Sequence, residues 1–210
     1  MRIINLKQNK MKNLILTTLL LLSINCKAQS PIIDIIDDDG SQINGAYFKD
    51  INNLLNQFEG TYIYTNGSSS FKMVLVKKEL QAYNGYYEDL IIGEYQYIKD
   101  GVQIANTLSE ISTTYLNQRT HKIDGNFLVD KNHRAWKCPS CGTTELRLRA
   151  TIQDIVSSRF ATLIMRRTTE GGQEVMKIKI THISRAILEE GMPEPLEFAL
   201  PVGEFTLIKQ

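Results

Sequence analysis

Polar and apolar residues alternate with a period of two along much of this chain, and this pattern constrains the fold more than any other feature. The stretch ELRLRATI (145–152) places its apolar residues on one face of an extended strand and its two arginines on the other. Five further stretches share this character: FKMVLVKK (71–78), GEYQYIKD (93–100), SRFATLIMRR (158–167), EVMKIKITHI (174–183) and GEFTLIKQ (203–210). Because open sheet edges must be protected, the sequence predicts a mainly β protein, built as one closed antiparallel barrel of about 8–10 strands. A β-sandwich is the alternative.

Helical signals are few and short. The clearest is DINNLLNQF (50–58), where the Asp50 side chain is placed to cap the first turn. The segments TTYLNQRTHK (113–122) and SRAILEEGM (184–192) give weaker signals. We therefore expect one or two short helices beside the barrel.

The tetrapeptide Tyr83-Asn84-Gly85-Tyr86 predicts a β-hairpin, because its two-residue turn needs positive φ at both centres and Asn-Gly adopts this readily. Simple extension of the pairing from this turn sets apolar residues opposite charged ones. A bulge that shifts the register by one residue restores an apolar face. We expect such a bulge, and it would bring together Phe71, Met73, Tyr95 and Tyr97.

Residues 58–62, FEGTY, lie between the first helical signal and a strand–hairpin–strand segment. This order resembles the start of a lipocalin-like barrel, in which a Gly-x-Trp motif plugs the closed end. Tyr62 stands here at the position of the tryptophan. The resemblance favours a barrel over a sandwich.

The N-terminal stretch has the pattern of a secretory signal peptide. Basic residues open it, an apolar core of 11 residues covers 14–24, and the small residue Ala28 precedes Gln29. A membrane-spanning helix needs about 20 apolar residues, so this core is too short to span. We expect a signal peptide over residues 1–28, cleavage after Ala28, and an exported protein, periplasmic or secreted. The remaining residues, 29–210, are expected to form a single β domain.

Two features of this stretch leave alternatives open. Cys26 directly follows the apolar core, where a lipidated bacterial cysteine would lie, although its flanking residues fit a lipobox poorly. Lipidation of Cys26 would make the protein an outer-membrane lipoprotein, and only then do we expect contact with a membrane. Met11 is also an alternative start to Met1.

Charge argues against a nucleic-acid partner. The chain has 24 basic and 23 acidic residues, and residues 1–28 contain five of the basic ones and none of the acidic ones. The expected mature chain therefore carries a net charge of −4, whereas nucleic-acid binding needs a clustered positive surface. Residues 131–185 are locally basic, with 11 basic and 4 acidic residues. An anionic glycan or lipid headgroup could meet them, although they also fit the solvated faces of strands.

Cys138 and Cys141, in the sequence KCPSCG, are the two cysteines of the expected mature chain. A zinc site would need further ligands such as His121 and His133, and a redox site would need a helix after the first cysteine. The sequence after the motif has a strand pattern instead. Because exported proteins fold in oxidising compartments and Pro139 favours a β-turn, we predict a Cys138–Cys141 disulfide that staples a turn between strand-like segments.

Other motifs do not predict chemistry. The acidic run DIIDDD (34–39) lacks acidic residues at the first and last positions of an EF-hand loop, and Gly-x-Ser-x-Gly does not occur. Glu88 and Asp89 are adjacent, so on a strand they would point to opposite faces. We predict no catalytic, cofactor-binding or metal-binding residue, and no cofactor. All nine tyrosines lie between Tyr47 and Tyr115, which suits a recognition surface but also ordinary strands.

Several segments resemble a family of short secreted proteins from flavobacteria and related Bacteroidota, to which no function is assigned. These segments are CKAQ (26–29), NGAYFKDINNLLNQFEGTYIYTNGSSSFKMVLVKKE (44–79), NGYYEDLIIGEYQYI (84–98) and EFTLIK (204–209), whereas residues 118–185 match poorly. The resemblance implies export and a β fold. We expect a non-enzymatic binding module for a small apolar or glycan ligand. The alternative is a cell-surface structural or interaction protein without a small ligand, and a hydrolase is the weakest hypothesis.

Overall fold

The structure is a computed structural model that describes residues 31–186 and 195–210. The expected signal peptide (1–28), including Cys26, and most of the third helical signal lie outside the described residues. The strands are β1 (Ile32–Asp34), β2 (Tyr47–Lys49), β3 (Gly60–Asn66), β4 (Ser69–Tyr83), β5 (Tyr86–Lys99), β6 (Val102–Asn106), β7 (Ile123–Val129), β8 (Arg147–Gln153), β9 (Phe160–Glu170), β10 (Gln173–Thr181) and β11 (Gly203–Lys209). The 3-10 helices are η1 (Ile35–Asp37), η2 (Asn56–Phe58), η3 (Leu108–Ser112) and η4 (Gln118–Thr120).

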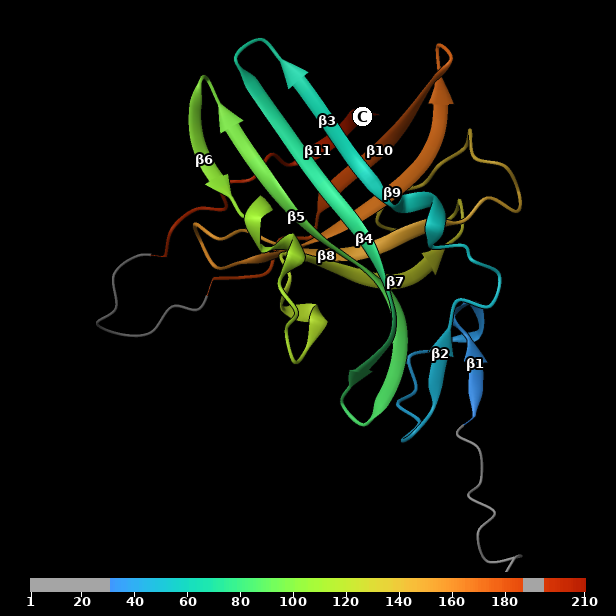
Figure 1. Ribbon diagram of the computed structural model, residues 1–210. Coiled ribbons are helices and arrows are strands. Elements are labelled where there is room, and N and C mark those ends of the chain that lie inside the picture. The colour runs from blue at the N-terminus through green and yellow to red at the C-terminus, as the bar shows by residue number, and fades with distance from the viewer. Residues whose placement is uncertain (1–30, 187–194) are drawn as a thin grey trace, which may run out of the picture. The chain divides into compact units, whose positions relative to one another are not determined.

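Eight strands close into an antiparallel barrel, which confirms the predicted fold and rules out the sandwich (Figure 1). Their order is β5–β4–β3–β11–β10–β9–β8–β7, and pairing of β7 with β5 completes the ring. The second edge of β5 is shared along its length: β2 pairs with residues 87–88, β7 with 91–93 and β6 with 96–99. The long β5 strand is thereby protected by three partners in succession.

The six alternating stretches all form barrel strands, namely β4, β5, β8, β9, β10 and β11. One face of each strand supplies apolar residues to one continuous core, to which β8 contributes Leu148, Ala150 and Ile152. Ile164 of β9 is an exception, because it lies in a separate cluster on the outer wall. The polar residues of the same strands lie on the outer face. The period-two pattern therefore fixes which side chains fill the barrel.

Two glycines allow the barrel to close, because they lie in the pairing between β5 and β7. A Cβ on Gly125 would stand 2.6 Å from the Cα of Ala150 and 2.9 Å from the carbonyl oxygen of Arg149. A Cβ on Gly93 would stand 2.8 Å from the carbonyl oxygen of Val74. These contacts involve backbone that cannot turn aside, so a side chain at either position would push neighbouring strands apart.

The β4–β5 hairpin turns at Asn84 and Gly85, whose φ angles are 43° and 89°, as the Asn-Gly signal predicts. The pairing then shifts by one residue, so that Glu79 and Leu80 of β4 together oppose Asp89 of β5. This is the expected bulge.

Beyond the bulge, Phe71 pairs with Tyr97 and Met73 with Tyr95, and all four side chains lie in the core. The predicted grouping of these residues is confirmed. The hairpin tip extends past the barrel and is joined there by β2 and β1, which pair in parallel (Figure 1).

Residues 50–58 do not form the expected α-helix. The Asp50 carboxylate accepts bonds from the amides of Leu54 (2.7 Å) and Leu55 (2.9 Å), which lie beyond the two or three residues that a helix cap would reach. Asn53 also has a φ of 55°, which a right-handed helix does not accept, and only η2 is helical. The second helical signal, 113–122, likewise reduces to the short 3-10 helix η4.

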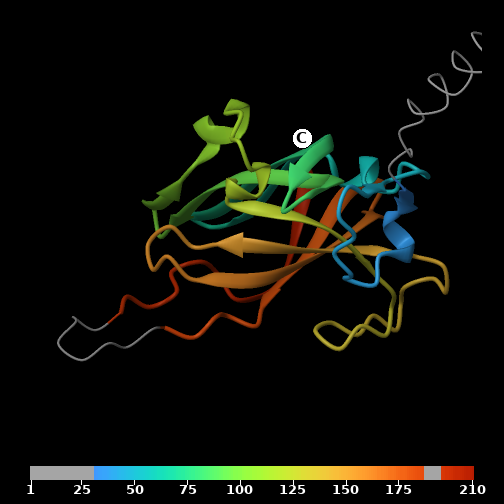
Figure 2. The same ribbon diagram turned by 90° about the horizontal axis from the view of Figure 1, so that it is seen from below.

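The two ends of the barrel are covered by different segments. At one end Leu55 and Phe58 are fully buried, and the Lys77 ammonium lies 3.0 Å from an Asp50 carboxylate oxygen. Tyr62 is fully buried nearby and donates its hydroxyl to the carbonyl of Glu59 (3.0 Å), so the Gly-x-Tyr motif does lie at this end. The described parts of the β10–β11 connection, residues 182–186 and 195–202, lie toward the opposite end from the β7–β8 connection (Figure 2).

Candidate ligand site at the barrel mouth

A pocket of about 210 Å³ opens at the barrel end where β3 joins β4 and β5 joins β6, and we call it the mouth. Strands β3, β4, β5 and β11 form its walls, and Pro201 of the connection borders it. Its polar lining residues are Asn66, Ser69, Ser70, Lys99 and Asp100. The mouth therefore combines the inward faces of four strands with two strand-joining turns.

Aromatic side chains form the inner walls of the mouth. Tyr64, Phe71 and Tyr97 are consecutive cross-strand partners on β3, β4 and β5, so alternation brings them into one row. Phe205 of β11 stands edge-on to Tyr64, with 5.3 Å between ring centroids. The rings of Phe71 and Tyr97 are 6.2 Å apart in a similar arrangement. Such a row offers flat apolar surface together with phenolic hydroxyls.

Polar groups form the rim. The Ser69 hydroxyl donates to the Asp100 carboxylate (3.3 Å) and accepts a bond from the Asp100 amide (2.9 Å), which ties together the β3–β4 and β5–β6 turns. Burial raises the pKa of the Tyr97 hydroxyl, and the charge of Asp100 raises it further. This hydroxyl therefore remains protonated near neutral pH, where it can donate or accept a hydrogen bond.

Below the mouth, side chains fill the barrel. Met73, Tyr95 and Leu163 have no exposed surface, and Leu200 from the β10–β11 connection is 3% exposed within the same core. The Tyr95 hydroxyl donates to the carbonyl of Gln153 at 2.8 Å, which holds the ring across the interior. A ligand that enters the mouth thus meets a packed floor, so the site suits a small group.

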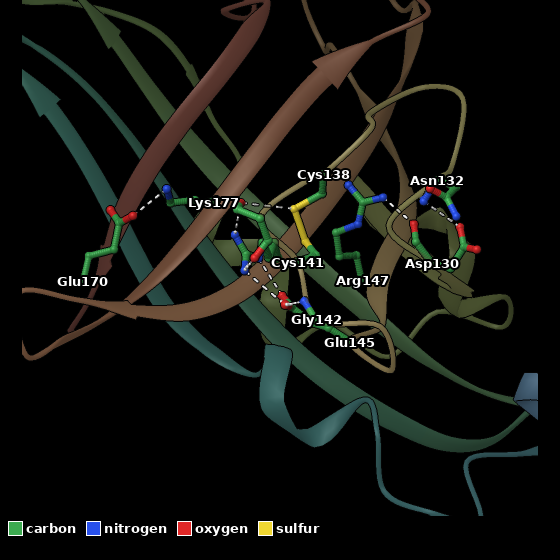
Figure 3. Close-up of a disulfide and its surroundings, with 11 residues drawn as sticks. Asp130, Asn132, Cys138, Cys141, Gly142, Glu145, Arg147, Glu170 and Lys177 are labelled. Atoms are coloured by element: carbon green, nitrogen blue, oxygen red, sulfur yellow. Dashed lines mark hydrogen bonds and ion pairs between the residues drawn. A yellow bond between two sulfur atoms is a disulfide. The ribbon is translucent and has the colours of Figure 1, made fainter.

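Cys138 and Cys141 form the predicted disulfide, with 5.4 Å between their Cα atoms (Figure 3). The amide of Cys141 donates to the carbonyl of Cys138 at 3.1 Å, so Pro139 and the following residue lie in a turn. Zinc binding and thiol redox chemistry both need free thiolates, which these bonded sulfurs do not supply.

The disulfide lies in a loop, residues 130–146, and not in a hairpin between strands. The strand-like pattern of FLVDKNHRAWK (127–137) predicts a strand that continues to the motif, but β7 ends at Val129. The reason is packing, because Trp136 is buried against Val129 and Ile164 on the outer wall and draws the loop over it. Glu145 of the loop binds Arg166 of β9 at 2.5 Å, which holds the loop down further.

The three histidines do not come together in one site. His121 is buried and its Nδ1 lies 2.7 Å from Glu94, with the Tyr115 ring packed against it. His133 and His182 lie on the outer wall, where they border a different hollow. Glu88 and Asp89 point to different partners, as their adjacency predicts.

Within residues 31–186 and 195–210, no three His, Cys, Asp or Glu side chains are grouped so that they could hold a metal ion. In the part of the chain that the structure describes, no helix is both long and apolar enough to cross a membrane.

Sequence reasoning finds part of this site and misses the rest. The expected bulge groups Phe71 with Tyr97, and the structure places both inside the barrel and not on an exposed recognition surface. That Tyr64 joins them follows only from the β3–β4 register. Phe205 and Pro201 are not identified in this way. Phe205 alternates with the apolar Leu207 and could have been assigned to the inner face, but the sequence does not show which end of the barrel it occupies.

The fold and the mouth define the protein as a small closed eight-stranded β-barrel with an aromatic-lined pocket at one end. The chain belongs to a family of unknown function, DUF6705, whose model matches residues 11–210. This match includes residues 118–185, which we expected to fit their family poorly. A comparison with curated proteins gives no match, and a comparison with solved structures gives none either.

Proposed function

We propose that this protein is a non-enzymatic binding module that takes one small ligand in the barrel mouth. The observation that carries the proposal is the row of Tyr64, Phe71 and Tyr97, faced by Phe205, on the inner walls of the mouth of an otherwise filled barrel. Aromatic side chains with a polar end are favoured at binding sites because they cover large area with few rotatable bonds.

Of the ligand classes expected from the sequence, a glycan fits the mouth better than a wholly apolar molecule. A saccharide ring has an apolar face for the aromatic row and hydroxyl groups for a polar rim, here Asn66, Ser70 and Lys99. A wholly apolar ligand would leave those rim groups unpaired, which costs free energy. The volume of about 210 Å³ suits one saccharide residue at the end of a chain.

The proposal can be tested with neutral monosaccharides and disaccharides, namely glucose, galactose, N-acetylglucosamine and cellobiose, by saturation-transfer NMR. Tyr64→Ala should weaken binding about fivefold, since an aromatic contact contributes ~1 kcal/mol. Tyr87→Ala is the matched control, because Tyr87 is 42% exposed on the hairpin tip and does not line the mouth. Binding that is equally weak in both variants, or absent for every probe, would contradict the proposal.

We further propose that the module acts outside the cytoplasm. The order of basic, apolar and small residues in 11–28 supports export, and a disulfide persists best in an oxidising compartment. Mass spectrometry of the native protein should find an N-terminus at Gln29, or a diacylated Cys26 if the protein is a lipoprotein. An exported chain that retains Met1 or Met11 would contradict this.

The alternative function, a surface interaction protein, is favoured by a separate observation. Large apolar side chains are exposed around β1, β2 and the tip of the β4–β5 hairpin, at Ile32, Ile36, Ile51, Leu80 and Tyr87. Exposed apolar patches of this kind mark interaction sites. Chemical cross-linking on intact cells would favour this alternative if a surface protein is captured by the unaltered chain and lost in Leu80→Ser with Tyr87→Ser.

A further inference from the structure

A groove runs over the outer wall of the barrel, across β7, β8 and β9, away from the mouth. It consists of two hollows of about 150 and about 200 Å³. Arg149 and Thr162 line both hollows, so the two adjoin at these residues. We call the smaller hollow the polar lobe and the larger one the basic lobe.

The strand register builds the floor of the groove. Thr151 of β8 is the direct partner of Thr162 on β9 and of Asp124 on β7, so their outward side chains form one cross-strand row. Arg149 lies two residues before Thr151 on the same face, at the junction of the lobes. The floor thus offers two hydroxyl groups directly beside a guanidinium.

The basic lobe is rich in positive charge. Its lining includes His133 and Arg134 from the β7–β8 loop, His182 after β10, and Arg149. Neither arginine forms a salt bridge to any residue that the structure describes. Burial lowers the pKa of His133, and the charges of Arg149, Arg147 and Arg134 lower it further, against a smaller opposing effect of Asp130.

The polar lobe has a different character, because Arg119, the arginine that this lobe does not share with the basic lobe, is already neutralised. Arg119 holds Glu88 through its Nε (2.6 Å) and Asp124 through its Nη1 (2.6 Å). Asn126 bridges the same network, accepting from Arg119 at 3.2 Å and donating to Glu88 at 3.0 Å. Apart from Arg149 at the junction, this lobe presents polar groups fixed in place, with no excess of positive charge.

From this asymmetry we infer that the outer groove binds an acidic saccharide. The carboxylate or sulfate of the sugar lies in the basic lobe against Arg149 and Arg134, and its uncharged hydroxyl groups lie along Thr162 and Thr151 toward the polar lobe. Planar guanidinium groups recognise carboxylate and sulfate through paired charge-assisted hydrogen bonds. A site with adjoining charged and neutral polar parts fits a molecule that carries both.

The groove and the mouth are independent of each other. The mouth is formed by β3, β4, β5 and β11, whereas the groove is formed by β7, β8 and β9 with flanking loops. Failure of the proposed mouth site therefore leaves the groove proposal unaffected, and the Tyr64→Ala variant serves as a control that should bind acidic probes normally.

The test uses calorimetric titration of residues 29–210 with three probes: oligogalacturonate, dextran sulfate and neutral dextran. At least one of the two acidic probes is expected to bind, and neutral dextran is not. Arg149→Gln should weaken binding by about tenfold, the factor that corresponds to loss of one charge-assisted hydrogen bond, and Arg134→Gln should weaken it as well. Lys137→Gln is the matched control, because Lys137 is an exposed cation of the same loop that does not line the groove.

Lys137→Gln should change the affinity by less than about twofold, as expected for an exposed charge outside the site. Equal losses in Lys137→Gln and Arg149→Gln would overturn the proposal in favour of non-specific charge attraction. Inorganic sulfate that binds as tightly as the acidic probes would reduce the groove to a simple anion site and overturn it too. Tighter binding to phosphatidylglycerol vesicles than to both acidic probes, lost in Arg149→Gln, would show that the groove binds a lipid surface. This result would also overturn the proposal.

Discussion

Asp89 offers a direct test of how the β4–β5 bulge is stabilised. Its buried carboxylate, 1% exposed, accepts three hydrogen bonds: from the Tyr47 hydroxyl (2.6 Å), the Asp50 amide (3.0 Å) and the Leu80 amide (2.9 Å). Leu80 is in the bulge and has a φ of 52°, so its amide lacks an ordinary ladder partner. One carboxylate thus connects the bulge to the segment that follows β2.

The cost of Asp89→Ala can be estimated from the donors that it leaves. The Asp50 amide is buried, and an unsatisfied buried donor costs about 1–3 kcal/mol. The Leu80 amide and the Tyr47 hydroxyl are partly accessible, so water can replace part of the hydrogen bonding that they lose. We expect destabilisation by about 3–4 kcal/mol, within the range found when one partner of a buried charged network is removed.

Asp89→Asn should cost less, about 1–2 kcal/mol, because the amide keeps one acceptor oxygen but places its NH₂ group against a backbone donor. Asp37→Ala is the control, since Asp37 is exposed, and it should change stability by less than about 0.5 kcal/mol. Urea unfolding followed by circular dichroism and by the fluorescence of Trp136, the single tryptophan, measures these differences.

A double-mutant cycle with Tyr47→Phe separates the hydroxyl bond from the backbone bonds. The coupling between Tyr47 and Asp89 should be about 1.5–3 kcal/mol, as for other hydrogen bonds to charged groups. If Asp89→Ala costs less than about 1 kcal/mol, or if Asp89→Asn costs as much as Asp89→Ala, then the carboxylate does not stabilise the bulge in this way.

Further outcomes are expected elsewhere in the molecule. Serine at both Cys138 and Cys141 should lower the free energy of unfolding by only about 1–2 kcal/mol, because the closed loop is short; thiol titration of the native protein should find neither cysteine free, and two thiols would contradict the disulfide. Gly125→Ala should cost about 1–3 kcal/mol in urea unfolding, because its Cβ would meet the backbone of β8; no loss would show that β7 can move aside. By NMR, His133 should titrate below 6.5, and Arg149→Gln should raise its pKa. Because the pKa of His133 is lower in the folded chain, the unfolded chain binds a proton at His133 more tightly. The contribution of His133 to the free energy of unfolding should therefore be lost as pH decreases through about 6.5. A contribution of His133 that does not change with pH would contradict this.

The barrel could be predicted because the signals for its strands and for its hairpin turn each lie within a short stretch of sequence. Each of the six alternating stretches specifies an inner and an outer face by itself, and Asn84-Gly85 specifies a turn. The conflict between apolar and charged residues along that hairpin is enough to require a bulge. Its position, opposite Asp89, depends on partners such as Tyr47 and Asp50 that are distant in sequence.

What could not be predicted depends on tertiary contacts. Residues 50–58 have a helical pattern with Asp50 at its start, yet Asp50 is held by Lys77 and Asn53 adopts positive φ, so the segment becomes a plug of turns. Likewise, the strand-like residues after Val129 follow Trp136 onto the outer wall. In both cases a local preference yields to the burial of a large apolar side chain.

The same alternation explains why the two proposed sites differ in how well the sequence reveals them. Inward residues of a closed barrel fill its interior, so a ligand meets them only at an end. The tyrosine pattern of the sequence is enough to suggest aromatic residues there.

Outward residues give no such signal. Arg149 and Thr162 are 13 positions apart along the chain and look like solvated strand residues until the β8–β9 register makes them neighbours. The basic composition of 131–185 is visible in the sequence. Whether it makes an anion site depends on which arginines have no carboxylate partner in a salt bridge. Arg119 shows that an arginine beside the same groove can be fully neutralised by such partners. Substitutions at Arg149 and at Tyr64 therefore act on surfaces that share no strand, and each can be interpreted without the other.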